Sequence, residues 1–194
     1  ENYRRFDARN QLPENPILFV GSSSIVFWET ANSFSGYPIT NRGFGGASLP
    51  EVIHYYDDVI KKHNPSMMVV YCDIDVENGK SPEFSVNAFK ELISRFEQDF
   101  ADIPILLMSM KPTLIDDIFG AEVRTNKMIT NQQLIKYANS KSNLHYVDIT
   151  SPMMDDNGKL KSEIFLNDGM HLNPLGYTFW DPVMKAAMDA LRMP

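Results

Sequence analysis

Short apolar runs alternate along this chain with longer segments in which apolar residues recur at helical spacing. The runs predict five strands, at residues 17–20, 39–44, 66–71, 103–110 and 144–149. The longer segments predict helices at about residues 48–63, 81–100, 121–140 and 174–192, and residues 1–15 are compatible with a short helix. The run at 66–71 shows no alternation, which is typical of a strand covered on both faces. Strands that alternate with helices predict an α/β fold, in which a five-stranded parallel sheet lies between two helical layers.

Two of the predicted helices carry recognisable start signals. Ser48 and Glu51 have the spacing of a capping box, and Pro82 stands at a first helical position. The sequence therefore predicts helix starts at these two positions.

Length and composition describe an ordinary globular chain. Its 194 residues are 43% hydrophobic and 22% charged, which favours one domain over residues 1–194. No apolar run is long enough to cross a bilayer. The net charge of −7 gives no reason to expect a nucleic-acid partner or an anionic membrane. The single cysteine, Cys72, excludes an internal disulfide and a cysteine-based metal cage, and no sequence motif indicates a metal or another cofactor.

The first residue is Glu1 rather than methionine, so we expect that an upstream segment has been removed. A signal peptidase would do this in a secreted or periplasmic protein, and the design of the expressed chain would do it in any compartment. Compartment and oligomeric state both stay open.

The junction at residues 17–25 is the first candidate for chemistry. An apolar run ends at Gly21, and three serines, Ser22 to Ser24, precede an amphipathic stretch. Such a junction indicates a strand, a sharp turn and a helix start. Two interpretations are open: the serines only cap the helix, or a hydroxyl lies at the carboxyl end of a strand, where open α/β sheets bind ligands.

A second candidate segment lies far downstream, where Asp168 precedes His171 by three residues. With the serines it forms the chain order Ser…Asp…His that one class of hydrolases shows. A serine hydroxyl needs a neutral imidazole to take its proton, and a carboxylate can hold that imidazole in the correct tautomer. The remaining histidines lack this context and are expected to be surface or core residues: His54, His63 and His145.

These segments together resemble the SGNH (GDSL-type) hydrolase family over nearly the whole chain. Residues 19–25 are similar to its first block, with Ser22 in place of the usual aspartate, residues 41–46 to its second and 168–173 to its last. Residues 78–82 and 175–177 extend the likeness. The resemblance implies a flavodoxin-like three-layer sandwich. It also implies roles for four residues: Ser23 as nucleophile, His171 as base, Asp168 as its partner, and Gly46, beside the backbone of Ser23, as an oxyanion-hole donor.

The family's third block departs from its pattern at residues 71–79. Alignment from Gly79 backwards places Cys72 at the glycine, Ile74 at the oxyanion asparagine and Asp75 at the final aspartate. Ile74 cannot donate a hydrogen bond, and Asp73 or Asp75 could replace the donor only if protonated. Loss of one oxyanion donor typically costs about 3–4 kcal/mol of transition-state stabilisation, so a slow or specialised enzyme is expected.

The predicted function is a serine esterase that cleaves small carboxyl esters, such as acetyl groups on carbohydrate. The connections at 111–120 and 153–166 are expected to line its pocket, and helix 121–140 to serve packing. The main alternative is a non-catalytic ligand-binding protein on the same scaffold.

Two further alternatives fit the sequence less well. Asp73 and Asp75 have the spacing of haloacid-dehalogenase-type phosphatases, but Glu77 stands where threonine or valine is expected and the motif follows the third strand instead of the first. A flavin or nucleotide binder is disfavoured because no Gly-x-Gly-x-x-Gly opens a helix.

Overall fold

The structure is a computed structural model that describes residues 2–120 and 122–192. Its described part contains a five-stranded, fully parallel sheet in the order β2-β1-β3-β4-β5, which is the flavodoxin-like order. The strands are β1 (Ile17–Gly21), β2 (Ile39–Gly43), β3 (Met67–Tyr71), β4 (Ile105–Met108) and β5 (Leu144–Val147). The predicted parallel sheet is confirmed, although the fourth and fifth strands are shorter than the apolar runs that predicted them.

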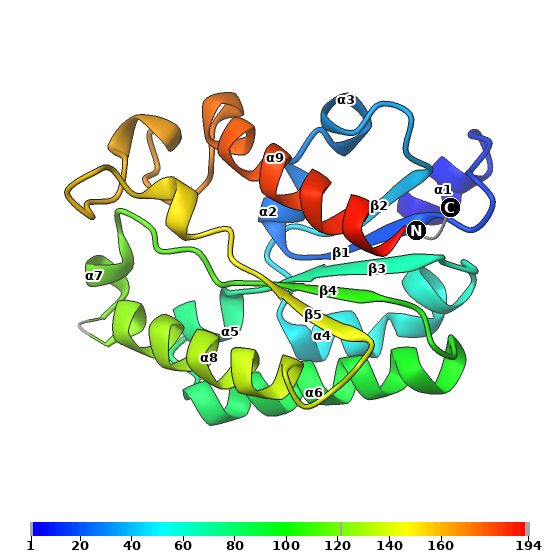
Figure 1. The fold of residues 1–194 in the computed structure, drawn as a ribbon, viewed down its shortest axis with the longest axis horizontal. Helices are drawn as coiled ribbons and strands as arrows, with labels where there is room; N and C mark the ends of the chain where they lie inside the picture. The colour runs from blue at the N-terminus through cyan, green and yellow to red at the C-terminus, as the bar shows by residue number, and fades with distance from the viewer. Residues whose placement is uncertain (1, 121, 193–194) are drawn as a thin grey trace.

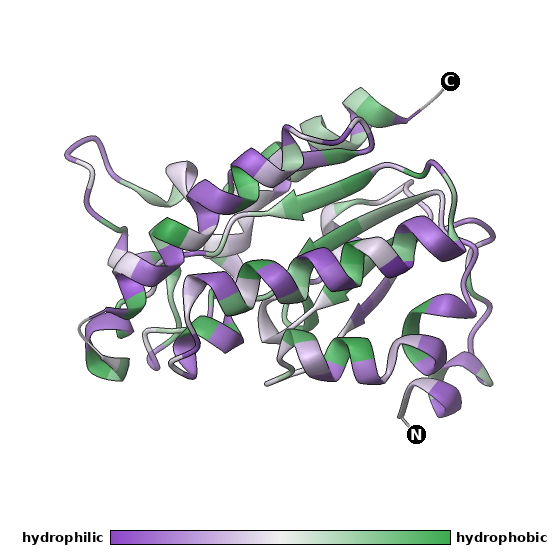
Figure 2. Ribbon diagram, turned by 90° about the horizontal axis from the view of Figure 1, so that it is seen from below, coloured by the Kyte–Doolittle hydropathy of each residue, from purple (hydrophilic) through white to green (hydrophobic). Residues whose placement is uncertain are grey.

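Helices cover both faces of this sheet (Figure 1). One layer contains α4 (Leu49–His54), α6 (Pro82–Asp99) and α8 (Val123–Ala138), and the other contains α2 (Ser23–Val26), α3 (Thr30–Ser33) and α9 (Pro174–Leu191). Alternate strand residues divide between the two cores: Leu18 faces the first layer, and Phe19 faces the second. The strands other than β2 are largely hydrophobic, while the helices carry hydrophilic residues on their outer surfaces (Figure 2). The three-layer α/β/α sandwich is therefore confirmed.

The helical predictions hold at their starts and fail at some ends. Ser48 and Glu51 form the predicted capping box, but the segment predicted as one helix over 48–63 divides into α4 and a π-helical turn at Asp57–Lys61. The loop predicted at 111–120 contains one helical turn, α7 (Asp116–Phe119). The predicted start of the next helix at Ala121 lies outside the described residues.

The remaining elements are short. They are α1 (Asn2–Asp7), α5 (Ile74–Glu77) after β3, and two 3-10 turns at Ser151–Met153 and Ser162–Ile164. In the described ranges no helix combines the length and the apolar character needed to cross a bilayer.

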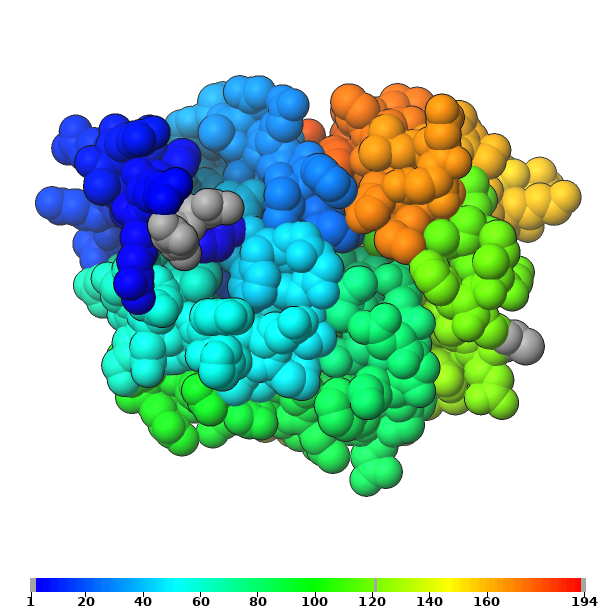
Figure 3. All heavy atoms as spheres, turned by 180° about the vertical axis from the view of Figure 1, so that it is seen from behind, coloured from blue at the N-terminus to red at the C-terminus, as the bar shows by residue number. Residues whose placement is uncertain are grey.

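The strand order decides which loops meet. β1 lies between β2 and β3, so the segments that follow these strands emerge next to one another at the carboxyl edge of the sheet. The connection between β5 and α9 returns to this edge, and its residues adjoin the α2 region on the surface (Figure 3). Segments near residues 23 and 171 are thereby brought together.

Candidate functional site

The turn after β1 presents Ser23 at the carboxyl edge. Gly21 has φ +149°, and a Cβ at this position would lie 1.8 Å from the carbonyl oxygen of Tyr71, so only glycine fits against β3. Ser22 then adopts an extended backbone at the N-cap position, and its side chain makes no capping hydrogen bond. Ser23 is the first residue of α2. The capping interpretation of this stretch therefore does not apply to Ser22.

Three of the predicted site residues form one hydrogen-bonded chain. His171 Nε2 lies 3.0 Å from Ser23 Oγ, and His171 Nδ1 lies 2.7 Å from Asp168 Oδ2. The backbone N–H groups of Met170 and His171 also donate to Asp168 Oδ1, each at 2.9 Å. Partial burial by itself raises the pKa of Asp168, but the hydrogen bonds from His171 and the two backbone groups outweigh it and lower the pKa to about 2. Asp168 is therefore a carboxylate at neutral pH.

Local contacts hold this histidine in place. The backbone carbonyl of His171 accepts a hydrogen bond from the N–H of Leu166 at 2.8 Å, and Gly169 O accepts one from the N–H of Leu114 at 2.9 Å. The Phe27 ring meets the imidazole edge-on with 4.9 Å between ring centroids. These contacts come from three separate segments, so the orientation of the imidazole is set by tertiary structure.

Gly46 lies in the connection between β2 and α4, at the same edge. The N–H of Phe44 donates to the carbonyl of Gly21 at 2.9 Å, which joins the start of this connection to the serine turn. Gly46 has φ +74°, in the left-handed region that glycine adopts without a steric cost. The second predicted block is thus positioned beside the first.

The third block supplies no donor side chain to this edge. Ile74 is the first residue of α5 and packs partly buried against the core. Asp75 accepts the N–H of Leu49 at 2.9 Å, and burial raises the pKa of Asp75. Asn78 is exposed at the end of α5.

Asp73 is buried and ionised. Burial raises its pKa, but the nearby ammonium groups of Lys111 and Lys127 outweigh burial, so that the pKa of Asp73 is lowered. Asp73 therefore carries no proton to donate to an oxyanion, and the Asp75 carboxyl is engaged by the backbone N–H of Leu49.

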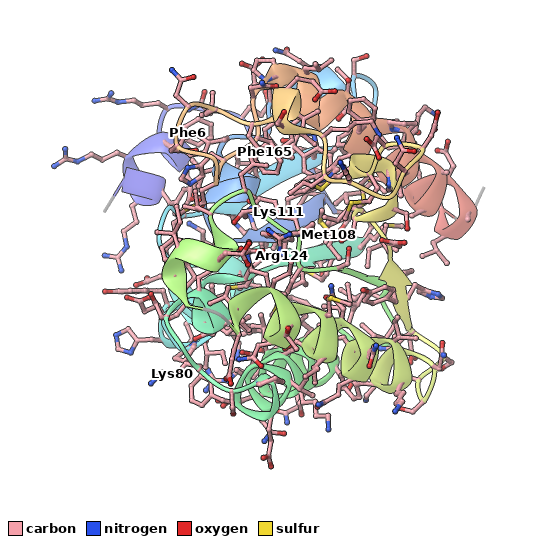
Figure 4. The ribbon with its side chains drawn as sticks, turned by 90° about the vertical axis from the view of Figure 1, so that its left-hand side faces the viewer. Phe6, Lys80, Met108, Lys111, Arg124 and Phe165 are labelled. Atoms are coloured by element: carbon pink, nitrogen blue, oxygen red, sulfur yellow. The ribbon has the colours of Figure 1, made fainter. Side chains whose placement is uncertain are left out.

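A buried charged network is the main feature that sequence reasoning missed. Lys111 was expected in a pocket-lining loop, yet its side chain is only 2% exposed and donates to Asp73 Oδ2 at 3.0 Å. Lys127, from the helix expected only to pack, donates to Glu77 at 2.7 Å and to Asp116 at 2.8 Å. The one sequence signal that pointed to this network was Lys111, which directly follows the apolar run predicted as a strand at 103–110. Figure 4 looks onto this edge and shows Lys111 between the two helical layers.

Two hollows lie near the edge. One of about 430 Å³ adjoins His171 and is lined by both apolar and polar side chains, among them Phe27, Leu166, Tyr177, Glu29, Asn32 and Asp181. Another of about 520 Å³ takes residues from both connections expected to line a pocket, including Pro112, Met154 and Leu160. The hollow beside His171 is the better candidate for substrate, because Phe27 and Leu166 contact the histidine itself.

The other histidines lie elsewhere. His54 is exposed, His145 is half-buried on β5, and His63 is buried, where its Nε2 accepts a hydrogen bond from Arg42 Nε at 3.0 Å. Across residues 2–120 and 122–192, no three His, Cys, Asp or Glu side chains are grouped so that they could hold a metal ion. The buried, ion-paired state of Asp73 also leaves it inaccessible as the nucleophile of a phosphatase.

Comparisons with known proteins place the fold. No family model matches the sequence, and no curated protein matches it. Among solved structures, the chain is similar to a protein described as a platelet activating factor from Streptococcus pneumonia, with a TM-score of 0.83, 20% identity and coverage of 98% of this chain and 90% of that one. For a protein assigned as an acylhydrolase from Bacteroides fragilis, the TM-score is 0.82 and the identity 18%, with coverage of 98% of this chain and 96% of that one. For a GDSL-like lipase from Bacteroides thetaiotaomicron, the TM-score is 0.81 and the identity 17%, with coverage of 97% of this chain and 96% of that one. The chain therefore has the SGNH/GDSL-type hydrolase fold.

Proposed function

We propose that this protein is a serine esterase that cleaves small carboxyl esters. The observation that carries the proposal is the continuous chain from Ser23 Oγ through the His171 ring to the Asp168 carboxylate, with distances of 3.0 and 2.7 Å. The likeness to lipases and acylhydrolases supports the same reaction class, since this chain places its serine, histidine and aspartate on their fold.

The geometry supports a two-step acyl transfer. Ser23 Oγ attacks the ester carbonyl while His171 Nε2 takes its proton, and Asp168 stabilises the imidazolium that forms. The imidazolium then gives its proton to the departing alcohol as the tetrahedral intermediate collapses to an acyl-serine. Water, deprotonated by the same imidazole, hydrolyses the acyl-serine and restores the enzyme. The backbone N–H groups of Ser23 and Gly46 are the proposed donors to the oxyanion.

The leaving alcohol is proposed to occupy the hollow beside His171. The imidazole must reach the leaving oxygen, so the alcohol lies on the histidine side of the serine. Aromatic side chains of Phe27 and Tyr177 line this hollow together with the polar Glu29, Asn32 and Asp181. A mixture of aromatic faces and hydrogen-bonding groups suits a polar alcohol such as a sugar, and an acetylated carbohydrate is the proposed substrate class.

The rate is proposed to be low. With Ile74 in place of the amide donor, the oxyanion keeps only backbone donors. Loss of one oxyanion donor typically lowers kcat by about a hundred- to a thousand-fold. The same replacement favours the second candidate function, a ligand-binding protein that uses the hollow beside His171 without catalysis.

Hydrolysis of short-chain aryl esters tests the proposal. Wild type should hydrolyse p-nitrophenyl acetate above the uncatalysed rate, Ser23→Ala should lose that activity, and Ser94→Ala, on the exposed side of α6, should keep it. Equal rates for wild type and Ser23→Ala would contradict a serine mechanism. Absence of activity in both, with saturable binding of an acetylated sugar, would favour the binding protein.

A further inference from the structure

A line of buried polar contacts joins the ends of three neighbouring strands. Ser22 directly follows β1, Asp73 lies two residues beyond β3 and Lys111 lies three residues beyond β4. Lys111 Nζ donates to Asp73 Oδ2 at 3.0 Å, and the hydroxyl of Tyr71 donates to the same oxygen. Ser22 Oγ lies 3.5 Å from Asp73 Oδ1, a long hydrogen bond. Each of these four side chains belongs to a residue that is at most 3% exposed, so water cannot replace any partner.

The charges along this line are arranged as near neighbours of opposite sign. A buried carboxylate without a partner is costly, and here Lys111 is its nearest cation. The groups that act on the Asp73 carboxylate are the lysines Lys111 and Lys127, the carboxyl group of Glu77, and the hydroxyls of Tyr71 and Ser22. Lys127 in turn is shared by Glu77 and Asp116. Lys111 is therefore the cation committed to Asp73.

This pair contacts or adjoins residues on both sides of the proposed oxyanion position. Ser22 precedes the proposed nucleophile Ser23, whose N–H is a proposed oxyanion donor. Asp73 precedes Ile74, which occupies the position of the missing amide. An unpaired carboxylate at Asp73 would repel the negative charge that develops on the substrate.

We propose that Lys111 is a positioning residue of the esterase site, which acts through Asp73. Its ammonium cancels the buried negative charge beside the proposed oxyanion position, and the Asp73 carboxylate so fixed holds Ser22 and the serine turn. The inference rests on the proposed esterase function. It adds a reason why acyl transfer can proceed at a site that has lost its amide donor.

Two variants that leave opposite charges at the Lys111–Asp73 pair distinguish an electrostatic role of Lys111 from a purely structural one. Lys111→Met leaves a bare carboxylate beside the proposed oxyanion position, while Asp73→Asn leaves a bare ammonium and retains an oxygen that can accept from Ser22. An electrostatic role predicts that the first slows acyl transfer far more than the second. A structural bridge predicts that both variants lose the same contact and slow equally.

The experiment is labelling of Ser23 by a fluorophosphonate, together with kcat and KM for p-nitrophenyl acetate, in wild type, Lys111→Met, Asp73→Asn and the double variant. We expect Lys111→Met to label and turn over about 10- to 100-fold more slowly than wild type, as for one unit charge several ångströms away at an effective dielectric constant of about 20, and the difference from Asp73→Asn to be larger still. The effect should appear in kcat with little change in KM. The double variant, without either charge, should be faster than Lys111→Met.

Each outcome is decisive. Wild type that neither labels nor hydrolyses overturns the esterase function itself. Wild type that labels, with equal rates in the two single variants, overturns the role of Lys111 alone. Folding is followed by the melting temperature. If Lys111→Met does not fold, Asp73→Asn is compared with the double variant: the proposal requires Asp73→Asn to be faster, and equal or slower labelling overturns it.

Discussion

The imidazole of His171 lies 3.0 Å from the hydroxyl of Ser23, although 148 positions separate the two residues in the chain. The contact exists because two loops at the carboxyl edge adjoin, one after β1 and one before α9. Neither loop could hold this geometry alone, since Leu166 and Asp168 contact the histidine from its own loop and Phe27 contacts it from the other.

Asp168→Asn should lower kcat by about 10³–10⁴-fold with little change in KM. The amide no longer accepts the ring N–H as a charged partner, so the neutral tautomer that presents a free Nε2 is lost and the imidazolium is not stabilised. Steady-state hydrolysis of p-nitrophenyl acetate measures the effect. The matched control is Asp156→Asn, an exposed carboxylate of the β5–α9 connection. Equal activity in both variants would show that Asp168 does not serve the histidine.

Ile74→Asn should raise kcat, by up to about a hundred-fold if the amide reaches the oxyanion. Ile74→Val is the control, because it trims the same partly buried side chain without adding a donor. Rates are measured with short-chain aryl esters. Equal rates in the two variants would mean that position 74 lies too far from the oxyanion to contribute.

Phe27→Ala should reduce kcat/KM for aryl esters by about 3- to 10-fold, because an edge-on aromatic contact is worth about 0.5–1.5 kcal/mol beyond its buried area. The ring both supports His171 and lines the hollow proposed for the alcohol. Leu175→Ala removes a similarly exposed apolar side chain from α9 and serves as the control. If both variants behave alike across a series of alcohols, the hollow does not bind the leaving group.

Lys127→Met should lower the free energy of unfolding by about 3–5 kcal/mol, because it removes the cation of the buried Glu77 and leaves the buried Asp116 with only the more distant Arg124, at 3.9 Å. The control is Lys185→Met, whose exposed pair with Asp189 is worth at most about 1 kcal/mol. Urea denaturation at neutral pH measures both. A loss below 1 kcal/mol for Lys127→Met would show that the buried network is not required for stability.

Stability should fall between pH 6.5 and 4 in part because of His63. Burial, reinforced by the positive charges of Arg42 and Lys62, lowers the pKa of His63 to about 4 from its ordinary 6.5. The folded state thus binds fewer protons than the unfolded state in this window. The contribution of His63 is complete above pH 6.5 and is lost as the pH falls through 4, a change of at most about 3 kcal/mol.

His63→Gln tests this pH dependence, because glutamine does not titrate and can still accept from Arg42. Denaturant unfolding at intervals from pH 7 to pH 4 should show a shallower decline in the variant. Parallel curves for the variant and wild type would assign the decline to other groups.

The apolar runs and their spacing were sufficient to predict the parallel sheet, its covered faces and the capping box at Ser48, because strand burial and helix capping are local consequences of residue type. The chain order of Ser23, Asp168 and His171 was sufficient to predict the candidate site, because few residue types can serve as a nucleophile and its base. Ends of elements were harder to predict, as at 48–63, where one helical pattern divides into α4 and a π-helical turn.

Only the tertiary structure decided which groups meet. A lysine after an apolar strand reads locally as the start of a solvated loop, yet Lys111 is buried because β4 lies next to β3 and brings it to Asp73. Likewise, the sequence left the ionisation of Asp73 open, since a buried carboxylate is protonated or charged according to its neighbours in space. Residue identity thus determined which catalytic groups the chain has. The adjacency of the strand ends determined where the charges of Lys111 and Asp73 lie relative to those groups.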